Sequence, residues 1–363
     1  MSRSAGETTA YQRRAGLDPA VAIHLAAARA GDQREFSGLT EPYRRELQLH
    51  CYRILGSLHD AEDIVQETLL RAWRRLETFE ERAPLRAWLY KIATNACFDA
   101  LDKRPRRVLP IAQTAPADPR QPFAPPITEP IWLEPYPDDL IDEPEAGPEA
   151  RYSLRESVSL AFLAALQGLP PRQRAVLILC DVLDWRAREA AQLLDITVSA
   201  VNSALHRARV TLQQRYRARG RDAVSGAPLD DRLRPLLERY VQAWESADID
   251  GLVNLLREDA TLSMPPLPTW YAGREAIIAA AQEKIFAGDA RGRWLMRPVR
   301  ANRQPACAVY QRDEAGVYHA FGISVLTVEQ DRVADIITFI DPALFPRFAL
   351  PLEISNQMVR KLT

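Results

Sequence analysis

The sequence predicts a multidomain protein with two all-α domains, the second containing a helix-turn-helix, and an α+β domain at the C-terminal end. The chain has 363 residues, which is too long for one ordinary domain. Two short helical patterns meet at residues 194–197, and the second ends in a cluster of basic residues. After a break rich in Gly, Ser and Pro at residues 220–228, the pattern becomes partly strand-like. The length sets the number of domains, and the two patterns set their types.

Charge is distributed unevenly along the chain. The formal net charge is -1, but Arg151 to Arg221 contains twelve Arg and only five acidic residues. Arg106 to Glu149 contains nine acidic residues and three Arg. The basic block suits contact with DNA, and the acidic block predicts a different kind of surface.

Cysteine usage and hydropathy exclude several protein classes. The four cysteines, Cys51, Cys97, Cys180 and Cys307, are far apart and form no C-x-x-C pair. We therefore expect free thiols, no disulfide framework, no metal and no cofactor. The N-terminus lacks the apolar run of a signal peptide, and no stretch is apolar enough to span a bilayer. These features predict a cytoplasmic protein without a membrane partner.

Breakers divide the chain into successive segments. Residues 1–18 are polar and predict a disordered tail. Helical periodicity runs over residues 19–104 and resumes over 149–220. Between them, residues 105–148 hold twelve prolines and predict an extended acidic linker, not a packed domain. Two aromatics in Ile131 to Tyr136 could dock on another surface. Residues 229–350 form the α+β domain, and 351–363 form a C-terminal tail.

The α+β domain begins with helices and ends with strands. Leu229 to Asp259 and Arg274 to Ala287 have helical patterns. Turns are expected at Gly316 and at Gln330-Asp331. Strand-like runs are Arg293–Ala301, Ala306–Arg312, Val317–Val328 and Arg332–Asp341. This order predicts helices that cover a curved antiparallel sheet.

The second helix of the helix-turn-helix has an apolar stripe and a polar face. Val201, Leu205, Ala208 and Leu212 recur at helical spacing, which predicts the buried side. The polar face offers small groups for base edges and arginines for phosphates. The candidate DNA-contacting residues are Thr197, Ser199, Ala200, Asn202, Ser203, His206, Arg207 and Arg209. A plain helical hairpin with a solvated basic face is the alternative.

The turn before this helix lacks the usual glycine. Asp195 stands in its place, and Asp is among the few residues that enter the left-handed region at modest cost. Thr197 or Ser199 can cap the helix that follows. The turn is therefore expected to form.

Two helices nearer the N-terminus carry further candidate surfaces. In Asp60 to Leu76, one side is apolar, and the other is a mixed polar stripe with one leucine, which suits docking to a protein. A solvated face is the alternative. The next helix, about Leu85 to Asp102, presents Lys91, Asn95 and Asp99 outward. The docking stripe consists of Asp63, Gln66, Glu67, Leu70 and Arg74.

Three segments carry a family resemblance. Asp60 to Trp73 resembles the core-binding helix of bacterial sigma factors, and Pro84 to Asn95 resembles their promoter-melting and −10-reading segment. The helix-turn-helix resembles their −35-reading domain. The chain is therefore similar to an extracytoplasmic-function (group IV, sigma-70 family) sigma factor over about residues 20–104 and 150–219.

The resemblance implies partners and site residues. Core RNA polymerase would be contacted at the clamp helices of its largest subunit and at its flap, and promoter DNA at two elements. The implied polymerase-binding residues are Asp63, Ile64, Val65, Gln66, Glu67 and Leu70. The implied −10 residues are Phe79, Arg82, Arg86, Trp88, Lys91, Asn95 and Asp99.

The loop at 79–84 would capture a flipped base, although core packing explains Trp88 equally well. A basic run at 103–107 suits phosphates. Asn202 and Ala204 stand where many relatives have Lys and Arg, so the −35 preference is not transferable.

Residues 229–350 resemble the SnoaL-like fold, a cone of helices against a curved sheet with a pocket. The resemblance rests on Met264 to Pro266, Trp270 to Arg274 and Phe339 to Pro342. Some sigma factors carry this domain as a fused regulator. Candidate pocket residues are Met264, Trp270, Tyr271, Tyr310, His319 and Asp341, and core packing or strand ends explain several of them as well. We expect a module that contacts a small ligand or a protein, and no enzyme.

The combined pattern favours a promoter-specificity subunit that directs core polymerase without covalent chemistry and is modulated in cis by its third domain. Two alternatives stay open: a stand-alone helix-turn-helix regulator with a ligand-sensing domain, and a fused SnoaL-like enzyme. Only the first hypothesis needs the docking stripe on Asp60 to Trp73, so binding to core polymerase discriminates among them.

Overall fold

The first part of the chain forms helices and the C-terminal part forms helices and strands, in agreement with the hydrophobic patterns of the sequence. The structure is a computed structural model that describes residues 19–80, 83–129, 131–141, 157–218 and 233–355. The chain divides into two compact units, one from residues 1–105 and 166–215 and the other from residues 106–165 and 216–363. The predicted tail at 1–18 lies outside the described residues. No helix in the described part of the chain is both long and apolar enough to cross a membrane.

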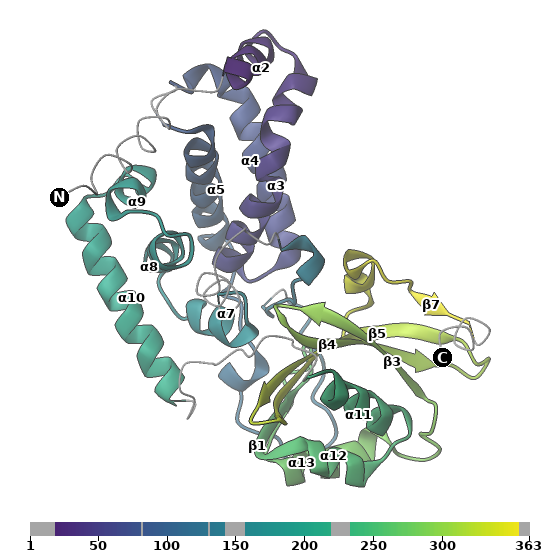
Figure 1. Ribbon diagram of the computed structural model, residues 1–363. Helices are drawn as coiled ribbons and strands as arrows, with labels where there is room; N and C mark the ends of the chain where they lie inside the picture. Colours follow the sequence, from purple (N-terminus) through teal and green to yellow (C-terminus); the bar gives the residue numbers. More distant parts are fainter. Residues whose placement is uncertain (1–18, 81–82, 130, 142–156, 219–232, 356–363) are drawn as a thin grey trace, which may run out of the picture. The chain divides into compact units, whose positions relative to one another are not determined.

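Short capping signals set the ends of the first helices. The first unit opens with α2 (Pro19–Arg29), α3 (Gln33–Leu55), α4 (Leu58–Arg74), the 3-10 turn η1 (Leu76–Thr78) and α5 (Leu85–Leu101). Asp32 caps α3 by accepting hydrogen bonds from the backbone N–H groups of Arg34 and Glu35. Gly56 ends α3 at a φ of 75°, and Ser57 caps α4 at once. Helices α3, α4 and α5 pack against one another as a bundle (Figure 1).

The helix-turn-helix completes the first unit. It comprises α8 (Pro171–Leu177), the π-helical turn η4 (Ile178–Val182), α9 (Ala187–Leu194) and α10 (Val198–Ala218). Buried Arg174 donates hydrogen bonds to the carbonyl oxygens of Ile54, Gln167 and Leu169. Breaking such a buried charged network is strongly destabilising. Arg174 therefore fixes α8 against the end of α3.

The second unit is built around a single mixed β-sheet. Its strands follow the order β2-β1-β6-β5-β4-β3, and β7 pairs with β5. The pair β1–β6 is parallel, and the other pairs are antiparallel. Asn302-Arg303 and Gln330-Asp331 form two-residue turns in which all four residues have positive φ, which is the type I′ geometry that joins hairpin strands. The strands are β1 (Leu256–Ser263), β2 (Trp270–Ala272), β3 (Trp294–Ala301), β4 (Gln304–Arg312), β5 (Tyr318–Glu329), β6 (Arg332–Phe339) and β7 (Glu353–Ile354).

Helices cover one face of this sheet. They are α11 (Arg234–Glu245), α12 (Ile249–Leu255), α13 (Arg274–Ala280) and the π-helical turn η5 (Ala281–Ile285) (Figure 1). Their apolar sides meet Cys307, Leu326 and Ile336 of the sheet in one core. The 3-10 helix η6 (Pro342–Phe348) follows β6. The meander from β3 to β6 confirms the predicted strands, and the predicted α+β class holds.

Two local predictions for this unit are wrong. The helix expected over Leu229 to Asp259 ends at Leu255, because Leu256 begins β1. Pairing of β1 with β2 and β6 overrides its helical pattern. The expected C-terminal tail contains β7, which pairs with β5 at Tyr318 and His319.

The proline-rich segment was expected to be an extended linker whose two aromatics could dock on another surface, and it makes contacts within the second unit. It belongs to the second unit and contains the short turns η2 (Pro110–Ala112) and η3 (Asp138–Leu140), with α7 (Leu160–Leu166) after it. Trp132 is 7% exposed, and Leu133 and Tyr136 are fully buried. Tyr136 and Asn302 exchange two hydrogen bonds, from the Tyr136 N–H to Asn302 Oδ1 (2.9 Å) and from the Asn302 N–H to the Tyr136 carbonyl (2.8 Å). Prolines remove donors but leave carbonyls and aromatic neighbours free to dock.

Candidate nucleic-acid and protein interfaces

The two sides of α10 follow the predicted stripe. Val201 and Ala208 are fully buried, and Leu205 and Leu212 are half-buried. The predicted DNA-contacting side chains are all exposed: Thr197, Ser199, Ala200, Asn202, Ser203, His206, Arg207 and Arg209. This arrangement leaves one face of a long helix accessible to a major groove.

Two arginines of this face differ in electrostatic state. Arg209 makes a bidentate pair with Asp181, at 2.9 Å from Nε and 2.6 Å from Nη2. The hydrogen bond to Asp181 raises the pKa of Arg209. Arg207 is exposed and has no carboxylate partner within the described ranges. Arg207 can therefore contact a phosphate directly, whereas Arg209 would have to exchange the Asp181 carboxylate for a phosphate.

The turn before α10 has the predicted geometry. Asp195 lies in the left-handed region at φ 53° and ψ 45°, and its N–H donates to the carbonyl of Ala191. Thr197 Oγ1 accepts a hydrogen bond from the N–H of Ala200 at 3.1 Å, so Thr197 is the cap. Both predictions for this turn are confirmed.

The polymerase-binding candidates on α4 divide by burial. Asp63, Gln66 and Leu70 are exposed, with Leu70 at 42%, and Ile64 and Glu67 are half-buried. Glu67 accepts from Arg71 at 2.7 Å, and Arg71 also donates to Asp99 at 2.9 Å.

Val65, which was predicted to bind polymerase with these residues, is buried instead of exposed. Val65 is 2% exposed and lies on the core side of α4 with Ala61. Its helical position places it opposite the stripe of Asp63, Gln66 and Leu70.

The −10 candidates are not equally accessible. Asn95 and Asp99 are exposed on α5. Phe79 is 3% exposed, and its ring centroid lies 5.2 Å from that of half-buried Trp88. Phe79 is therefore packed inside the first unit, and its contact with DNA stays a prediction. Lys91 pairs with Asp195 at 2.7 Å. Arg82 lies outside the described residues.

Arg86 is engaged within the first unit. Its Nε donates to both carboxylate oxygens of Glu46, at 3.0 and 2.9 Å. Its guanidinium carbon lies 4.9 Å from the ring centroid of Tyr90 and 5.7 Å from that of Trp185. Burial works against the charge, but the hydrogen bond and charge of Glu46, together with Tyr90, raise the pKa of Arg86.

A buried histidine adjoins this cluster. His50 Nε2 lies 2.9 Å from Thr94 Oγ1, and the ring centroids of His50 and Tyr90 are 4.8 Å apart. Complete burial, helped by the charges of Arg53 and Arg86, lowers the pKa of His50 to about 3. Sequence reasoning missed His50 and Glu46, which are ordinary residues of α3, and Trp185, which lies in the loop before α9, because the partners of each lie far away in the chain.

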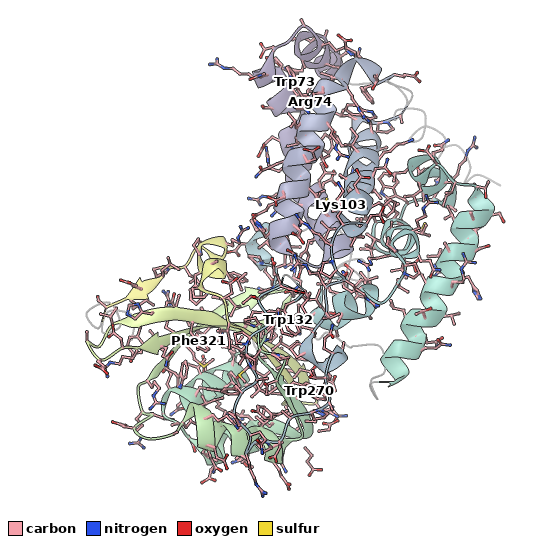
Figure 2. The ribbon with its side chains drawn as sticks, turned by 180° about the vertical axis from the view of Figure 1, so that it is seen from behind. Trp73, Arg74, Lys103, Trp132, Trp270 and Phe321 are labelled. Atoms are coloured by element: carbon pink, nitrogen blue, oxygen red, sulfur yellow. The ribbon has the colours of Figure 1, made fainter. Side chains whose placement is uncertain are left out.

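The basic run after α5 serves different contacts. Arg104 pairs with the buried carboxylate of Asp60. Arg107 is 6% exposed and donates to the carbonyl of Trp132 at 3.2 Å. Lys103, labelled in Figure 2, is exposed and stays a candidate for phosphate contact.

The six candidate pocket residues do not meet at one site. Met264 and Tyr271 belong to the core between helices and sheet, and Trp270 is buried beside them on β2. The rings of Tyr310 and Phe345 meet edge to face, with their centroids 5.0 Å apart.

The other two pocket candidates have local structural tasks. His319 pairs with Asp313 at 2.8 Å, and this hydrogen bond raises the pKa of His319. Asp341 caps η6 by accepting from the N–H of Ala343. These contacts give each of the six residues a local structural role, and a shared pocket stays a prediction.

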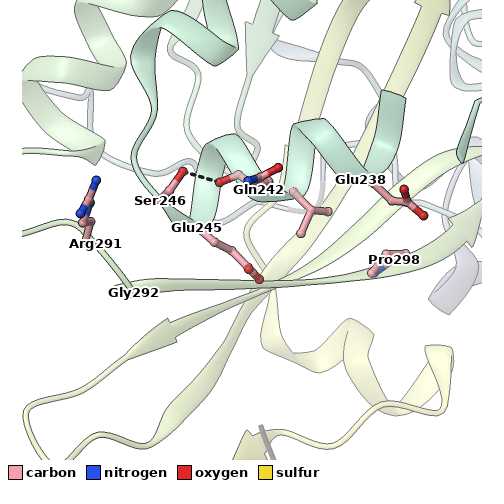
Figure 3. A pocket seen from close by; sticks show the side chains of 8 residues that line it. Glu238, Gln242, Glu245, Ser246, Arg291, Gly292 and Pro298 are labelled. Carbon is pink, nitrogen blue, oxygen red and sulfur yellow. Dashed lines mark hydrogen bonds between the residues drawn. The ribbon is translucent and has the colours of Figure 1, made fainter. Parts of the chain in front are cut away.

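An open groove lies elsewhere on the second unit. It has a volume of about 570 Å³ and lies along α11 and the start of β3 (Figure 3). Glu245 lines it and accepts from the Met296 N–H at 2.9 Å. Burial raises the pKa of Glu245. The groove is lined by Glu238, Val241, Gln242, Glu245, Ser246, Arg291, Gly292 and Pro298.

Three known families match the chain in order. Sigma-70 region 2 matches residues 39–107, sigma-70 region 4 matches residues 159–212, and the SnoaL-like domain matches residues 237–336. The extracytoplasmic-function (ECF) RNA polymerase sigma factor SigG of Mycobacterium tuberculosis is 46% identical over 342 residues, covering 92% of this chain and 90% of SigG. The chain belongs to the ECF sigma factors of RNA polymerase.

Other relatives share parts of this sigma factor. SigW of Bacillus subtilis is 27% identical over 193 residues, which cover 53% of this chain and 95% of SigW. The crystal structure of M. tuberculosis SigJ has the same fold, with a TM-score of 0.54 and 20% identity over 86% of this chain and 98% of SigJ. This sigma factor is a transcription-initiation factor and no enzyme, and its function implies core polymerase and promoter DNA as partners.

Proposed function

We propose that this sigma factor docks on the clamp helices of core polymerase through the exposed face of α4, with region 4 near the flap. In this proposal α10 reads the −35 element, and α5 with its preceding loop opens the −10 element in the cytoplasm. The observation that carries the proposal is the face of α10, where seven polar, small or basic residues are exposed above a buried stripe. That face suits a major groove.

The C-terminal SnoaL-like domain acts in cis in this proposal. The support is the burial of Leu133 and Tyr136 of the linker and the two hydrogen bonds between Tyr136 and Asn302. A linker held in this way is unavailable to the nucleic-acid path of the polymerase. Docking of the linker on its own domain therefore restrains transcription.

Two exposed apolar residues test the docking face. Leu70 on α4 and Ile23 on α2 are 42% and 70% exposed, so neither Leu70→Glu nor Ile23→Glu creates a cavity. Leu70→Glu should weaken binding to core polymerase by about tenfold or more, because a charge enters the centre of the interface. Ile23→Glu should bind like the unmodified protein. Pull-down with purified core polymerase measures the binding of both variants. Equal binding would contradict the proposal that the exposed face of α4 binds polymerase.

A further inference from the structure

The second unit holds a stretch of the linker against the edge of its sheet. Residues 114–127 run beside the edge strand β2 and the loop before it. The hydrogen bonds are Ala117 N–H to Trp270 O (2.8 Å), Trp270 Nε1 to Thr114 O (2.8 Å), Thr114 Oγ1 to Pro268 O (2.9 Å), Ala124 N–H to Thr269 Oγ1 (3.1 Å) and Ile127 N–H to Pro266 O (2.9 Å). An edge strand presents free backbone groups that accept a peptide in this manner.

Phe123 is the apolar anchor of this stretch. Its half-buried ring packs against the core between the helices and the sheet. The ammonium nitrogen of Lys284 lies 5.5 Å from the ring centroid of Phe123 and 5.5 Å from that of Tyr271. Lys284 also donates a hydrogen bond to the carbonyl of Pro119. The linker thus presents one aromatic ring and one oxygen to one cation.

Two polar groups beside Phe123, the Lys284 ammonium and the Tyr271 hydroxyl, lack a well-matched hydrogen-bonding partner among the described residues. No carboxylate within the described ranges pairs with Lys284, whose acceptor is a neutral carbonyl. The Tyr271 hydroxyl is buried and has no hydrogen-bond partner among the described residues. A buried hydroxyl without a partner costs about 1–3 kcal/mol. Lys284 also lies on the π-helical turn η5, a local geometry frequent at functional sites.

We propose that the site occupied by the Phe123 ring binds a small aromatic carboxylate. In the absence of this ligand, residues 114–127 occupy the site. The ligand ring would replace the Phe123 ring between Lys284 and the core. Its carboxylate would replace the Pro119 carbonyl and pair with Lys284, and the Tyr271 hydroxyl would donate to it. A charged acceptor makes a stronger hydrogen bond than a neutral carbonyl, so the ligand can compete with a tethered segment.

The ligand and the linker exclude each other in this arrangement. Binding of the carboxylate therefore favours the state in which residues 114–127 are released, and release of the segment favours binding. This consequence for transcription rests on the proposed function. The binding event itself does not, because Phe123, Lys284 and Tyr271 all belong to the second unit.

The test uses the full-length protein and 3-phenylpropionate as the probe, with 3-phenylpropan-1-ol and 3-phenylpropylamine as neutral and cationic counterparts. Calorimetry measures affinity, and hydrogen exchange measures the amides of Ala117, Ala124 and Ile127. The acid should bind about fivefold or more tightly than either counterpart and should speed exchange at these amides. Phe123→Ala vacates the site and should tighten binding of the acid by about fivefold or more.

Matched charge variants complete the test. Lys284→Gln should abolish the preference for the acid, whereas Arg291→Gln removes a cation at the separate groove and should keep it. The proposal is overturned if exchange rises in Phe123→Ala but the acid still does not bind. It is equally overturned if acid, alcohol and amine bind alike. These measurements involve no polymerase, so they fail or succeed independently of the docking face on α4.

Discussion

Side chains from distant parts of the chain meet around Tyr90 of α5. Trp185 lies 5.3 Å from the Tyr90 ring, and Arg86 lies over both rings while it bonds Glu46. Such cation–π contacts contribute about 0.5–1 kcal/mol at exposed sites and more when desolvated. Loss of DNA binding in an Arg86 variant would therefore report packing as much as promoter contact. Exposed Asn95, about two and a half turns further along α5 than Arg86, separates these roles better.

His50 gives the first unit a pH dependence with a defined sign. The pKa of His50 is about 3 in the folded protein against an ordinary value of 6.5, so below pH 6.5 the unfolded chain binds the additional proton. The free energy of unfolding should be highest above pH 6.5. It should fall by up to about 1.4 kcal/mol per pH unit between pH 6.5 and pH 3. Urea unfolding at a series of pH values measures this slope.

His50→Gln keeps a polar group near Thr94 but cannot titrate in this range. The variant should be less stable than the unmodified protein near neutral pH, and its stability should depend less on pH below 6.5. His59→Gln is the matched control, since the His59 side chain is 64% exposed and should leave the slope unchanged. An equally steep slope in His50→Gln would assign the acid sensitivity to other groups.

At the scale of elements, residue spacing and turn residues correctly predicted the helices, turns and strands that depend on local sequence. The stripe of α10, the left-handed turn at Asp195 and the strands β3 to β6 follow from spacing and turn residues. Strand β1 could not be found in this way, because Leu256 to Ser263 continues a helical pattern with three charged residues. Its strand state depends on β6, which lies more than 60 residues away in the sequence. Nonlocal pairing of this kind leaves no local signal.

Within α10, the two arginines predict different salt dependences. Arg207 has no carboxylate partner in the described part of the chain, whereas Arg209 is held by Asp181. Arg207→Ala should lower affinity of the holoenzyme for a promoter fragment and reduce the slope of log K against log salt by about 0.9. Arg209→Ala should change the slope less, because Asp181 already neutralises that charge. Anisotropy titrations between about 50 and 200 mM KCl measure both slopes.

A third variant on the same face of α10 tests recognition of the DNA sequence separately from phosphate contact. Asn202 is exposed on the same face but uncharged, so Asn202→Ala should leave the salt slope unchanged and alter the preference for −35 sequences. Equal slopes for Arg207→Ala and Arg209→Ala would show that the pair with Asp181 does not persist in solution.

For the whole molecule, composition predicted a proline-rich linker with aromatics that could dock, but not the contacts that hold it. Dense prolines indicated an extended spacer, and most of the described residues from Pro110 to Pro137 lie outside helices and strands. Its packing depends on partners that composition does not reveal, such as the Asn302 side chain in the β3–β4 turn. The candidate site shows the same limit, because exposure on α4 and α10 follows from periodicity, whereas the engagement of Arg86, Lys91 and Arg209 comes from tertiary contacts.

Asn302 offers a way to release the linker in the intact protein. Its side chain accepts from the Tyr136 N–H and donates to the Val158 carbonyl at 2.8 Å, and its φ of 57° suits glycine. Asn302→Gly therefore keeps the turn but removes both side-chain bonds, which should cost about 1–3 kcal/mol. Hydrogen exchange at the Tyr136 amide should accelerate.

Release of the linker should also raise transcript yield from a cognate promoter with core polymerase, because the held segment becomes available to the nucleic-acid path. Gln330→Gly is the matched control, since Gln330 has a φ of 51° in the other type I′ turn and is exposed. It should change neither exchange at Tyr136 nor transcription. If Asn302→Gly frees the Tyr136 amide and transcription stays the same, the linker is held for stability alone. In that case the SnoaL-like domain does not restrain the sigma factor through this contact.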